Sequence, residues 1–442
     1  MPLFKSLKTR LALCKIIMYS HAHSYYYLSG ELVKEDSLIK RILRENNVVT
    51  VFQPVVSMKE MRIVGFEALS RGICSETGNI ISPSNMFAMA RDEDCDLELE
   101  RLCRRTAMKS YKTIPNFNKY LLFLNIDTCV IDKNDIESTN YTKALTDEFG
   151  INYSSISLEI VESKIENNHN LVSFVDNYKK LGYYVSLDDF GAMHSNMNRI
   201  ILSKPNIIKI DMGLIRNIHD NYYQQSIITS IIDIAKKTGA LTLAEGLENM
   251  EDIMKSYELG IDLYQGFFFH RPCIDVGSAI GFIQDKINYT VGYVKNKLAE
   301  NVTIRKNRHT NFENITSLLK QEAKGRSLDA FYKALIANIS FFPEIERIFL
   351  LDNEGMQTLP SVMNPIHEIR KTKSFSMFHE NHSDHSLKDY YYYLKKLDAG
   401  RYFTDTFISS TSRNILRTMS CTLTVRDEDY ILCIDFIDSL KS

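Results

Sequence analysis

Between residue 50 and about residue 290, short apolar runs alternate with stretches of helical length and pattern. This alternation constrains the fold most, because strands that alternate with helices form a mainly parallel sheet. A hairpin of Thr50–Met58 and Met61–Ser70 precedes the alternation and makes one strand antiparallel to the rest. About eight strands over about 240 residues predict an α/β fold, a closed (β/α)₈ barrel with one antiparallel strand. The later apolar runs are Leu121–Asn125, Ile156–Val161, Tyr184–Asp189, Ile207–Asp211, Leu241–Glu245 and Leu263–Phe269.

Glycine and proline positions predict where several helices begin and end. Gly182, Gly239 and Gly260 each follow a helical stretch and precede a strand, and glycine is favoured at that position of a helix. Ser82 and Pro83 match an N-cap followed by proline in the first turn.

Polar residues stand at the C-terminal ends of the predicted strands. In a parallel barrel these ends converge on one mouth. Five of the residues are carboxylates, which would repel one another without cations. Hard Mg²⁺ or Mn²⁺ favours such oxygens, and two ions about 3.5–4 Å apart can cleave a phosphodiester. The set is Glu67, Asn125, Glu159, Asp188, Asp189, Lys209, Glu245 and Gln265.

Each member of the set also has an ordinary structural explanation. A single glutamate at a strand end is usually a surface residue, and Lys209 alone would more often pair with Asp211 than do chemistry. The hypothesis of a functional site depends on all of these residues occurring together, in the order expected of successive strands.

The segments on either side of the barrel differ from it. Residues 1–45 are expected to be helical, because Leu7, Leu11, Cys14 and Met18 repeat at helical spacing among basic residues. Packing of this helix on the chain itself or on a partner is favoured over a membrane-surface helix.

Residues 286–314 are expected to form a linker helix. Residues 315–442 are expected to form an α+β regulatory domain, with a helix at about 315–340 and a meander that contains a hairpin of 419–425 and 430–436.

Composition excludes several classes of protein. The 53 basic and 55 acidic residues give a net charge of −2, which argues against binding a nucleic acid polymer. No apolar run approaches the length of a membrane span, so membrane association is not expected. The eight cysteines show no CxxC pair, as is typical of a reduced, cytoplasmic protein.

These motifs resemble those of the EAL-domain family of cyclic-di-GMP phosphodiesterases, over about residues 46–285. A bare Glu-Ala-Leu tripeptide would be a weak signal, whereas eight motifs in order are specific. The matching pieces are Phe52–Pro54, Glu67–Arg71, Leu124–Asn125, Glu159–Glu162, Asp188–Gly191, Lys209–Asp211, Ala244–Glu248 and Gln265–Phe267, with Pro272 beyond.

The resemblance implies a (β/α)₈ barrel that hydrolyses cyclic di-GMP to linear pGpG at a two-metal Mg²⁺ or Mn²⁺ site. It implies that Lys209 orients or deprotonates the attacking water, together with Glu67 and Glu245 as catalytic residues. A homodimer is also expected. The implied metal ligands are Glu67, Asn125, Glu159, Asp188, Asp189 and Glu245. The implied substrate-binding residues are Gln53, Leu69, Arg71 and Gln265, and the implied supporting residues are Glu162, Asp211 and Glu248.

One position departs from the family pattern. After Asp188-Asp189-Phe190-Gly191 the family usually has a small residue and then glycine, but here Met193 occupies the glycine position. If that position needs a positive φ, methionine strains the loop. The alternative function is therefore a catalytically weak receptor for cyclic di-GMP that signals through the C-terminal domain. A scaffold acting through protein contacts alone is disfavoured, because it has no need of an intact ligand set.

The C-terminal residues resemble PAS- or Cache-like domains. This resemblance implies a sensory or dimer-forming role, with a small-molecule or protein signal that the sequence does not identify. The tyrosines at positions 390–393 either line a pocket or belong to the core.

Overall fold

The computed structural model describes residues 25–28, 31–34, 37–127, 131, 136–161, 167–192, 197–367, 383–397, 400–409 and 412–438. The chain divides into two compact units, Met1–Asn296 and Lys297–Ser442. In the described residues, no helix has both the length and the apolar character needed to cross a membrane.

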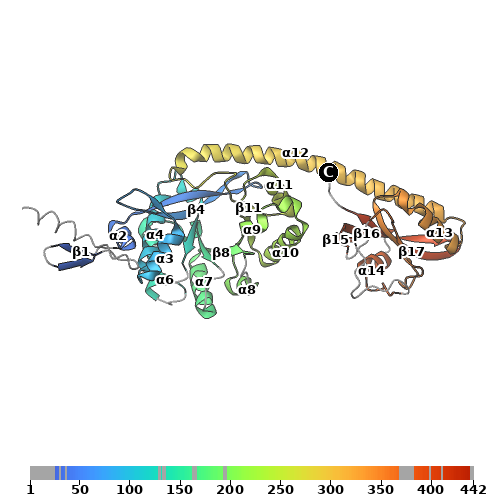
Figure 1. The fold of residues 1–442 in the computed structure, drawn as a ribbon, viewed down its shortest axis with the longest axis horizontal. Coiled ribbons are helices and arrows are strands. Elements are labelled where there is room, and N and C mark those ends of the chain that lie inside the picture. The colour runs from blue at the N-terminus through green and yellow to red at the C-terminus, as the bar shows by residue number, and fades with distance from the viewer. Residues whose placement is uncertain are drawn as a thin grey trace, which may run out of the picture. The chain divides into compact units, whose positions relative to one another are not determined.

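Eight strands of the first unit close into a barrel (Figure 1). Strand β3 pairs antiparallel with both β4 and β11, whereas every other pair around the barrel is parallel. The predicted barrel with one antiparallel strand is therefore confirmed. The strands are β3 (Val48–Ser57), β4 (Arg62–Ile73), β6 (Leu121–Ile126), β7 (Ile156–Val161), β8 (Tyr184–Phe190), β9 (Ile207–Ile210), β10 (Leu241–Ala244) and β11 (Leu263–Tyr264), with β5 (Ile80–Ile81) added at the edge of β4.

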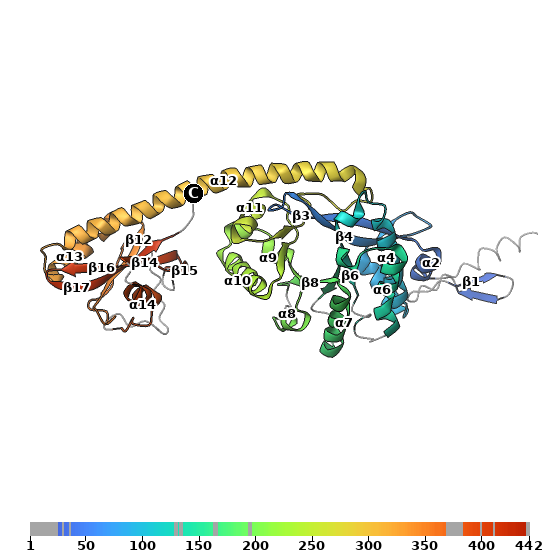
Figure 2. The ribbon, with the colours of Figure 1, turned by 180° about the vertical axis from the view of Figure 1, so that it is seen from behind.

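Helices surround the barrel in both side views (Figures 1 and 2). The predicted ends are confirmed: Ser82 Oγ accepts from Asn85 N–H, and Gly182, Gly239 and Gly260 cap helices with φ of 100°, 75° and 100°. The helices are α3 (Pro83–Asp92), α4 (Asp96–Tyr111), α6 (Ile136–Phe149), α7 (Asn168–Leu181), α8 (Asn198–Ser203), α9 (Met212–Ile215), α10 (Tyr222–Thr238) and α11 (Met250–Leu259), with 3₁₀ turns η1 (Phe117–Lys119), η2 (Tyr153–Ser155) and η4 (Ile218–Asp220).

Strand β11 is shorter than the predicted run Leu263–Phe269. The chain turns after Tyr264, where Phe269 N–H donates to the Gly266 carbonyl. A Cβ atom on Gly266 would lie 2.0 Å from the Leu247 carbonyl oxygen, so only glycine fits this turn.

The N-terminal segment differs from the helical prediction. Among the residues of this segment that the structure describes, β1 (Tyr25–Leu28) and β2 (Glu31–Lys34) form an antiparallel hairpin, and only α2 (Leu38–Glu45) is helical. Tyr25, Tyr26, Tyr27 and Val33 belong to residue types that favour extended backbone. The helical prediction considered only the spacing of apolar residues and not this preference. The stripe from Leu7 to Met18 lies outside the described residues.

Helix α12 (Val276–Ala323) contains the whole segment that was predicted as a linker helix, 286–314. The prediction of one helix over 315–340 is wrong. Two helices cover this range, the end of α12 and α13 (Leu328–Asn338), and Gly325 between them has a φ of 72°. The boundary between the compact units falls inside α12, and the domain limits stay a prediction.

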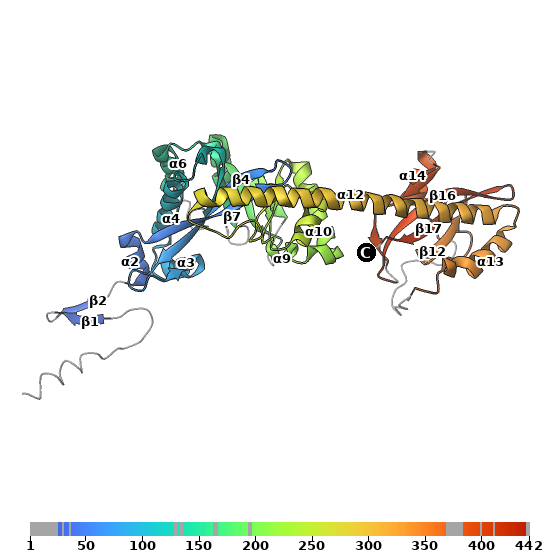
Figure 3. The same cartoon turned by 90° about the horizontal axis from the view of Figure 1, so that it is seen from above.

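The second unit is built on an antiparallel sheet with the order β13-β12-β17-β16-β14, and β15 pairs with β16. One face packs against α12 and α13 (Figure 3). Phe312, Leu319 and Phe331 lie in the core that these elements share. The elements are β12 (Ile345–Leu351), β13 (Val362–Met363), β14 (Arg401–Phe403), β15 (Phe407–Ile408), β16 (Ile415–Val425), β17 (Glu428–Ile437), α14 (Asp389–Lys396) and η5 (Ile339–Phe341).

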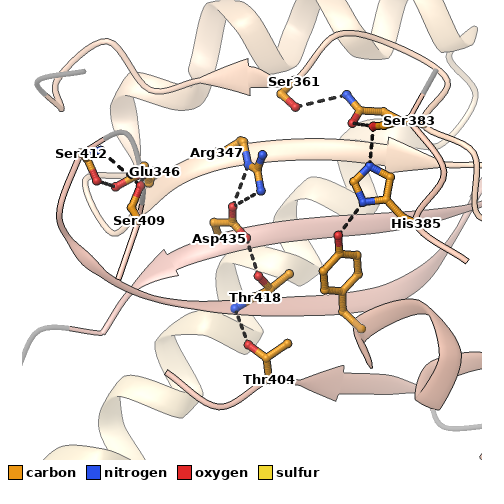
Figure 4. Close-up of polar contacts among 12 residues, drawn as sticks. Glu346, Arg347, Ser361, Ser383, His385, Thr404, Ser409, Ser412, Thr418 and Asp435 are labelled. Carbon is orange, nitrogen blue, oxygen red and sulfur yellow. Dashed lines mark hydrogen bonds and ion pairs between the residues drawn. The ribbon is translucent and has the colours of Figure 1, made fainter. Parts of the chain in front are cut away.

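The opposite face of this sheet is polar at one end and apolar at the other. Figure 4 shows Arg347 of β12 paired with Asp435 of β17, which also accepts from Thr418 of β16. At the apolar end, Tyr390 and Tyr391 pack against the core cluster that contains Phe349 and Leu394. These two tyrosines are therefore partly buried at the edge of the core, whereas Tyr392 and Tyr393 are exposed.

Candidate metal and catalytic site

The predicted residues meet at one mouth of the barrel because their strands are paired in parallel. Asn125 of β6 lies opposite Glu159 of β7, and Lys209 of β9 lies opposite Leu243 of β10. Glu245 and Gln265 directly follow β10 and β11. The side chains of this mouth are therefore brought together from strands that are far apart in sequence.

Lys209 lies at the centre of the carboxylates. Its Nζ is 2.7 Å from Glu159 Oε1 and 2.8 Å from oxygens of both Asp188 and Glu245, and Glu67 Oε2 is 3.9 Å away. Lys209 and Glu159 are only 1% and 0% exposed. The ammonium therefore joins carboxylates from four strands. The sequence alone also allowed an ion pair of Lys209 with Asp211, but Lys209 pairs with these four carboxylates instead.

The electrostatics of the cluster favour added positive charge. Burial lowers the pKa of Lys209, but the surrounding carboxylates raise it well above its usual value. Burial raises the pKa of Glu159 well above its usual range, and it raises the pKa of Glu245 to about 8, in both cases against the effect of Lys209. One ammonium thus does not balance the carboxylates, which leaves a site suited to cations or protons.

Amide groups hold Glu67 from two sides. Asn125 Nδ2 donates to Glu67 Oε1 at 3.1 Å, and Gln265 Nε2 donates to Glu67 Oε2 at 2.5 Å. Gln265 Nε2 also lies 3.3 Å from Gln53 Oε1 of β3. Asn125 and Gln265 therefore orient Glu67, and Gln53 accepts from Gln265. Contact of Gln53 and Gln265 with a substrate stays a prediction.

The residues present fit a metal ion. Ligand oxygens of Asp188, Asp189 and Glu245 all lie within 4.8 Å of one another. Within the described part of the chain, the buried atoms Glu159 Oε2 and Gln265 Oε1 have no hydrogen-bond partner. Buried oxygens without donors are costly unless a cation or a proton meets them, so the donor set suits a hard divalent cation.

The two consecutive aspartates reach the same cluster through a local distortion of β8. Side chains that are adjacent in a regular strand point to opposite faces. Asp189 has a φ of 54°, and the pairing of β8 with β9 shifts register between Leu187 and Phe190. The sequence motif placed both aspartates at the mouth, but it did not indicate this bulge.

Other predicted residues lie at the edge of the cluster or outside it. Leu69 and Arg71 follow Glu67 at alternate positions of β4 and are half-buried. Burial lowers the pKa of Arg71, and the charge of Glu67 opposes this effect. Asp211 Oδ1 accepts from Gly213 N–H at the start of α9, and exposed Glu248 lies 3.7 Å from Arg216. Glu162 and Met193 lie outside the described residues.

Several curated relatives are described as cyclic di-GMP phosphodiesterases. A probable cyclic di-GMP phosphodiesterase, PdeI of Escherichia coli, is 27% identical over 239 residues, which are 53% of this chain and 30% of that protein. The cyclic di-GMP phosphodiesterase PdeA of Borreliella burgdorferi is 27% identical over 248 residues, which are 54% of this chain and 36% of that protein. The match thus spans about a third of the length of these relatives.

A solved structure shares the fold of both units. The Bacillus subtilis YkuI protein, with an EAL domain and in complex with cyclic di-GMP and calcium, superposes with a TM-score of 0.70 at 22% identity. The alignment covers 91% of this chain and 99% of that chain. The likeness concerns the fold alone, and the PAS- or Cache-like assignment of the second unit stays a prediction.

The family model for the EAL domain matches residues 36–272, more than half of the 442 residues. This range contains all the strands of the barrel and every residue of the carboxylate cluster. The match therefore agrees with the observed fold and site, and the chain belongs to the EAL-domain family.

Proposed function

We propose that this protein hydrolyses cyclic di-GMP to linear pGpG in a reaction that depends on Mg²⁺ or Mn²⁺. The observation that carries the proposal is the buried Lys209 surrounded by Glu67, Glu159, Asp188 and Glu245 at the mouth of an EAL barrel. Relatives described as cyclic di-GMP phosphodiesterases support the choice of substrate. All the ligand types that such a reaction needs are present.

The strand-end side chains would hold the cations. The ligands would be Glu67, Asn125, Glu159, Asp188, Asp189 and Glu245. Two bound ions activate a water molecule and stabilise the leaving oxygen in phosphodiester cleavage.

The remaining side chains position the reactants. Lys209 orients the attacking water, and Gln265, which also donates to Gln53, keeps Glu67 in place. Half-buried Arg71, four residues after Glu67 on β4, suits a phosphate because its guanidinium offers two parallel donors. Leu69 contributes apolar contact to the same substrate.

A direct assay tests the proposal. The full chain is incubated with cyclic di-GMP and Mg²⁺ or Mn²⁺, and the products are separated by chromatography. We expect pGpG from the wild type and from Glu251→Ala, which changes an exposed residue of α11, but none from Glu67→Ala. Wild-type protein that binds cyclic di-GMP without forming pGpG under either metal would contradict it.

The same assay examines a second candidate, a receptor that binds cyclic di-GMP and barely cleaves it. Met193 at a position where the family has glycine favours this candidate. A strained loop residue costs about 1–3 kcal/mol, which would reduce the population of the ordered loop about 5- to 150-fold. Under this candidate Met193→Gly raises turnover with little change in dinucleotide affinity. Equal rates for wild type and variant would exclude strain at Met193 as the cause.

The C-terminal unit would regulate the barrel in either case. Every residue of the carboxylate cluster lies in the first unit, so we propose that residues beyond about 315 bind a signal or a partner and do not catalyse.

A further inference from the structure

The end of the barrel opposite the carboxylate cluster has a cavity of about 420 Å³, which we call the basal pocket. Its wall includes the first residues of β4, β6, β8, β9, β10 and β11, whereas the cluster lies where the strands end. Small-molecule sites have volumes of about 300–1,000 Å³, so the basal pocket is large enough to hold a ligand. The proposed reaction makes no use of this end of the barrel.

The floor of the basal pocket is apolar. Leu121, Ile207 and Leu263 line it, and they also pack in the barrel interior around Phe123. A ligand on this floor would therefore contact the lowest layer of the barrel core, and it would gain free energy by removing apolar surface from water.

Aromatic and aliphatic side chains project at the sides of the pocket. Tyr184 is 41% exposed and Leu241 is 46% exposed, and both line the pocket. Tyr120 lines it as well, with its ring packed edge to face on Phe66 at 5.1 Å between centroids. An exposed tyrosine ring beside an apolar floor offers a stacking surface for a flat ring.

The charged side chains that line the pocket are all basic. They are Arg62 and Lys119, and no Asp or Glu lines the pocket. Arg62 pairs at 2.6 Å with Glu60, which lies outside the lining, in an exposed ion pair of the kind that contributes little stability. In the described part of the chain, Lys119 has no ion-pair partner. The pocket therefore favours a negatively charged ligand.

We propose that the basal pocket binds a small organic anion that carries an aromatic ring, such as a nucleoside monophosphate or an aromatic carboxylate. The floor and Tyr184 suit the ring, and Lys119 and Arg62 suit the anionic group. A simple inorganic anion would leave the apolar floor uncovered, and a neutral aromatic compound would leave Lys119 without a counterion.

This proposal does not rest on the proposed enzymatic function. Arg62 begins β4 and Glu67 lies five residues further along the same strand, so the pocket and the carboxylate cluster are at opposite ends of the barrel. Binding is measured in EDTA, where no metal-dependent reaction occurs. Failure of binding and failure of hydrolysis are therefore separate observations.

Isothermal titration calorimetry of the full chain with four probes tests the ligand class. Adenosine 5′-monophosphate and indole-3-acetate carry both a ring and an anionic group, whereas adenosine and inorganic phosphate each lack one of the two. Because hydrogen bonds to charged groups are stronger than neutral ones, we expect at least one aromatic anion to bind about tenfold more tightly than adenosine and inorganic phosphate. The tighter of the two identifies a phosphate or a carboxylate as the preferred group.

The other outcomes of this titration would overturn the proposal. Adenosine that binds as tightly as its monophosphate would remove the role of charge. Inorganic phosphate that binds as tightly as both aromatic anions would remove the role of the ring. Absence of binding by both aromatic anions would exclude the ligand class altogether.

Matched variants locate the bound anion. Lys119→Glu should weaken its binding about tenfold or more, and Tyr184→Ala should weaken it about fivefold or more, as expected for loss of a stacking ring. Lys112→Glu and Tyr223→Ala change exposed residues that do not line the pocket, and both should bind as the wild type does. Denaturant unfolding verifies that each variant is folded.

Arg71→Ala distinguishes the basal pocket from the carboxylate mouth, because Arg71 lies beyond Glu67 on β4. We expect this variant to bind the anion with wild-type affinity. Binding that is lost in Arg71→Ala but kept in Lys119→Glu and Tyr184→Ala would place the ligand at the mouth and overturn the proposal.

Discussion

Lys209 Nζ lies 2.7 Å from Glu159 Oε1, and neither side chain is more than 1% exposed. A buried ion pair of this kind contributes little net stability, but removing one partner leaves an uncompensated buried charge. The pair therefore links the stability of the barrel to its chemistry. Lys209 is placed by β9 and Glu159 by β7, with β8 between them in the sheet.

Replacing Lys209 with methionine should affect both properties. In EDTA, Lys209→Met should lower the free energy of unfolding by about 3–5 kcal/mol, because the carboxylates lose their shared cation. With metal present, loss of the group that orients the water should lower kcat about 10²–10⁴-fold with a modest change in KM. Denaturant unfolding and steady-state kinetics measure the two effects. Lys237→Met, at an exposed position of α10, is the control, and a change confined to KM would contradict the role of Lys209.

Glu67 should be required for metal binding and not for folding. Its two carboxylate oxygens accept from Asn125 and Gln265, so Glu67→Gln keeps the size of the side chain and removes the charge. We expect weaker binding of Mn²⁺ in calorimetric titrations, no formation of pGpG, and an unchanged far-ultraviolet spectrum. Undiminished hydrolysis by this variant would rule out Glu67 as a metal ligand.

A buried pair on α4 gives a pH dependence of stability. Burial raises the pKa of Glu100 to about 7 from 4.5, although Arg104 donates to it. Between these pH values the native state holds a proton that the unfolded chain releases, so the free energy of unfolding falls as pH rises from 4.5 to 7. The difference in pKa corresponds to at most about 3 kcal/mol.

Glu100→Gln should remove this part of the pH dependence. Denaturant unfolding at pH 5 and pH 7.5 should show a smaller loss of stability in the variant than in the wild type. Glu98→Gln, at an exposed position of the same helix, serves as the control and should follow the wild type. Parallel pH profiles for wild type and Glu100→Gln would contradict the raised pKa.

The barrel and its strand-end residues could be predicted because they follow local periodicity. Alternating strands and helices determine the fold class, and residues at the C-terminal ends of parallel strands meet at one edge. The hydrogen bond of Gln265 to Gln53 joins residues 212 positions apart across the closure of the barrel. Periodicity carries no information on such closure, so this role of Gln53 was not predicted.

Features that depend on a single backbone torsion, or on how far a helix continues, were harder to predict. The sequence placed one helix across Gly325, but the positive φ at this residue ends the helical path. The polar stretch at 286–314 indicated a linker helix, and it forms the middle of a helix of 48 residues, a length that the sequence pattern did not indicate. The bulge at Asp189 also depends on one torsion, and both Asp and Asn are residue types that tolerate it.

Asp189 should contribute its charge to metal binding and its left-handed backbone conformation to the bulge of β8. Substitutions at this position can separate the two contributions. Its φ of 54° lies in the left-handed region, which Asn and Gly adopt readily and β-branched residues do not. In EDTA, Asp189→Asn and Asp189→Gly should unfold at about the wild-type denaturant concentration. Asp189→Val should lose about 1–3 kcal/mol of unfolding free energy from backbone strain.

All three variants lack the carboxylate that lies with Asp188 and Glu245, so calorimetric titration with Mn²⁺ should show weakened binding in each. Wild-type stability in Asp189→Val would contradict the strain, and wild-type metal affinity in Asp189→Asn would remove Asp189 from the ligand set.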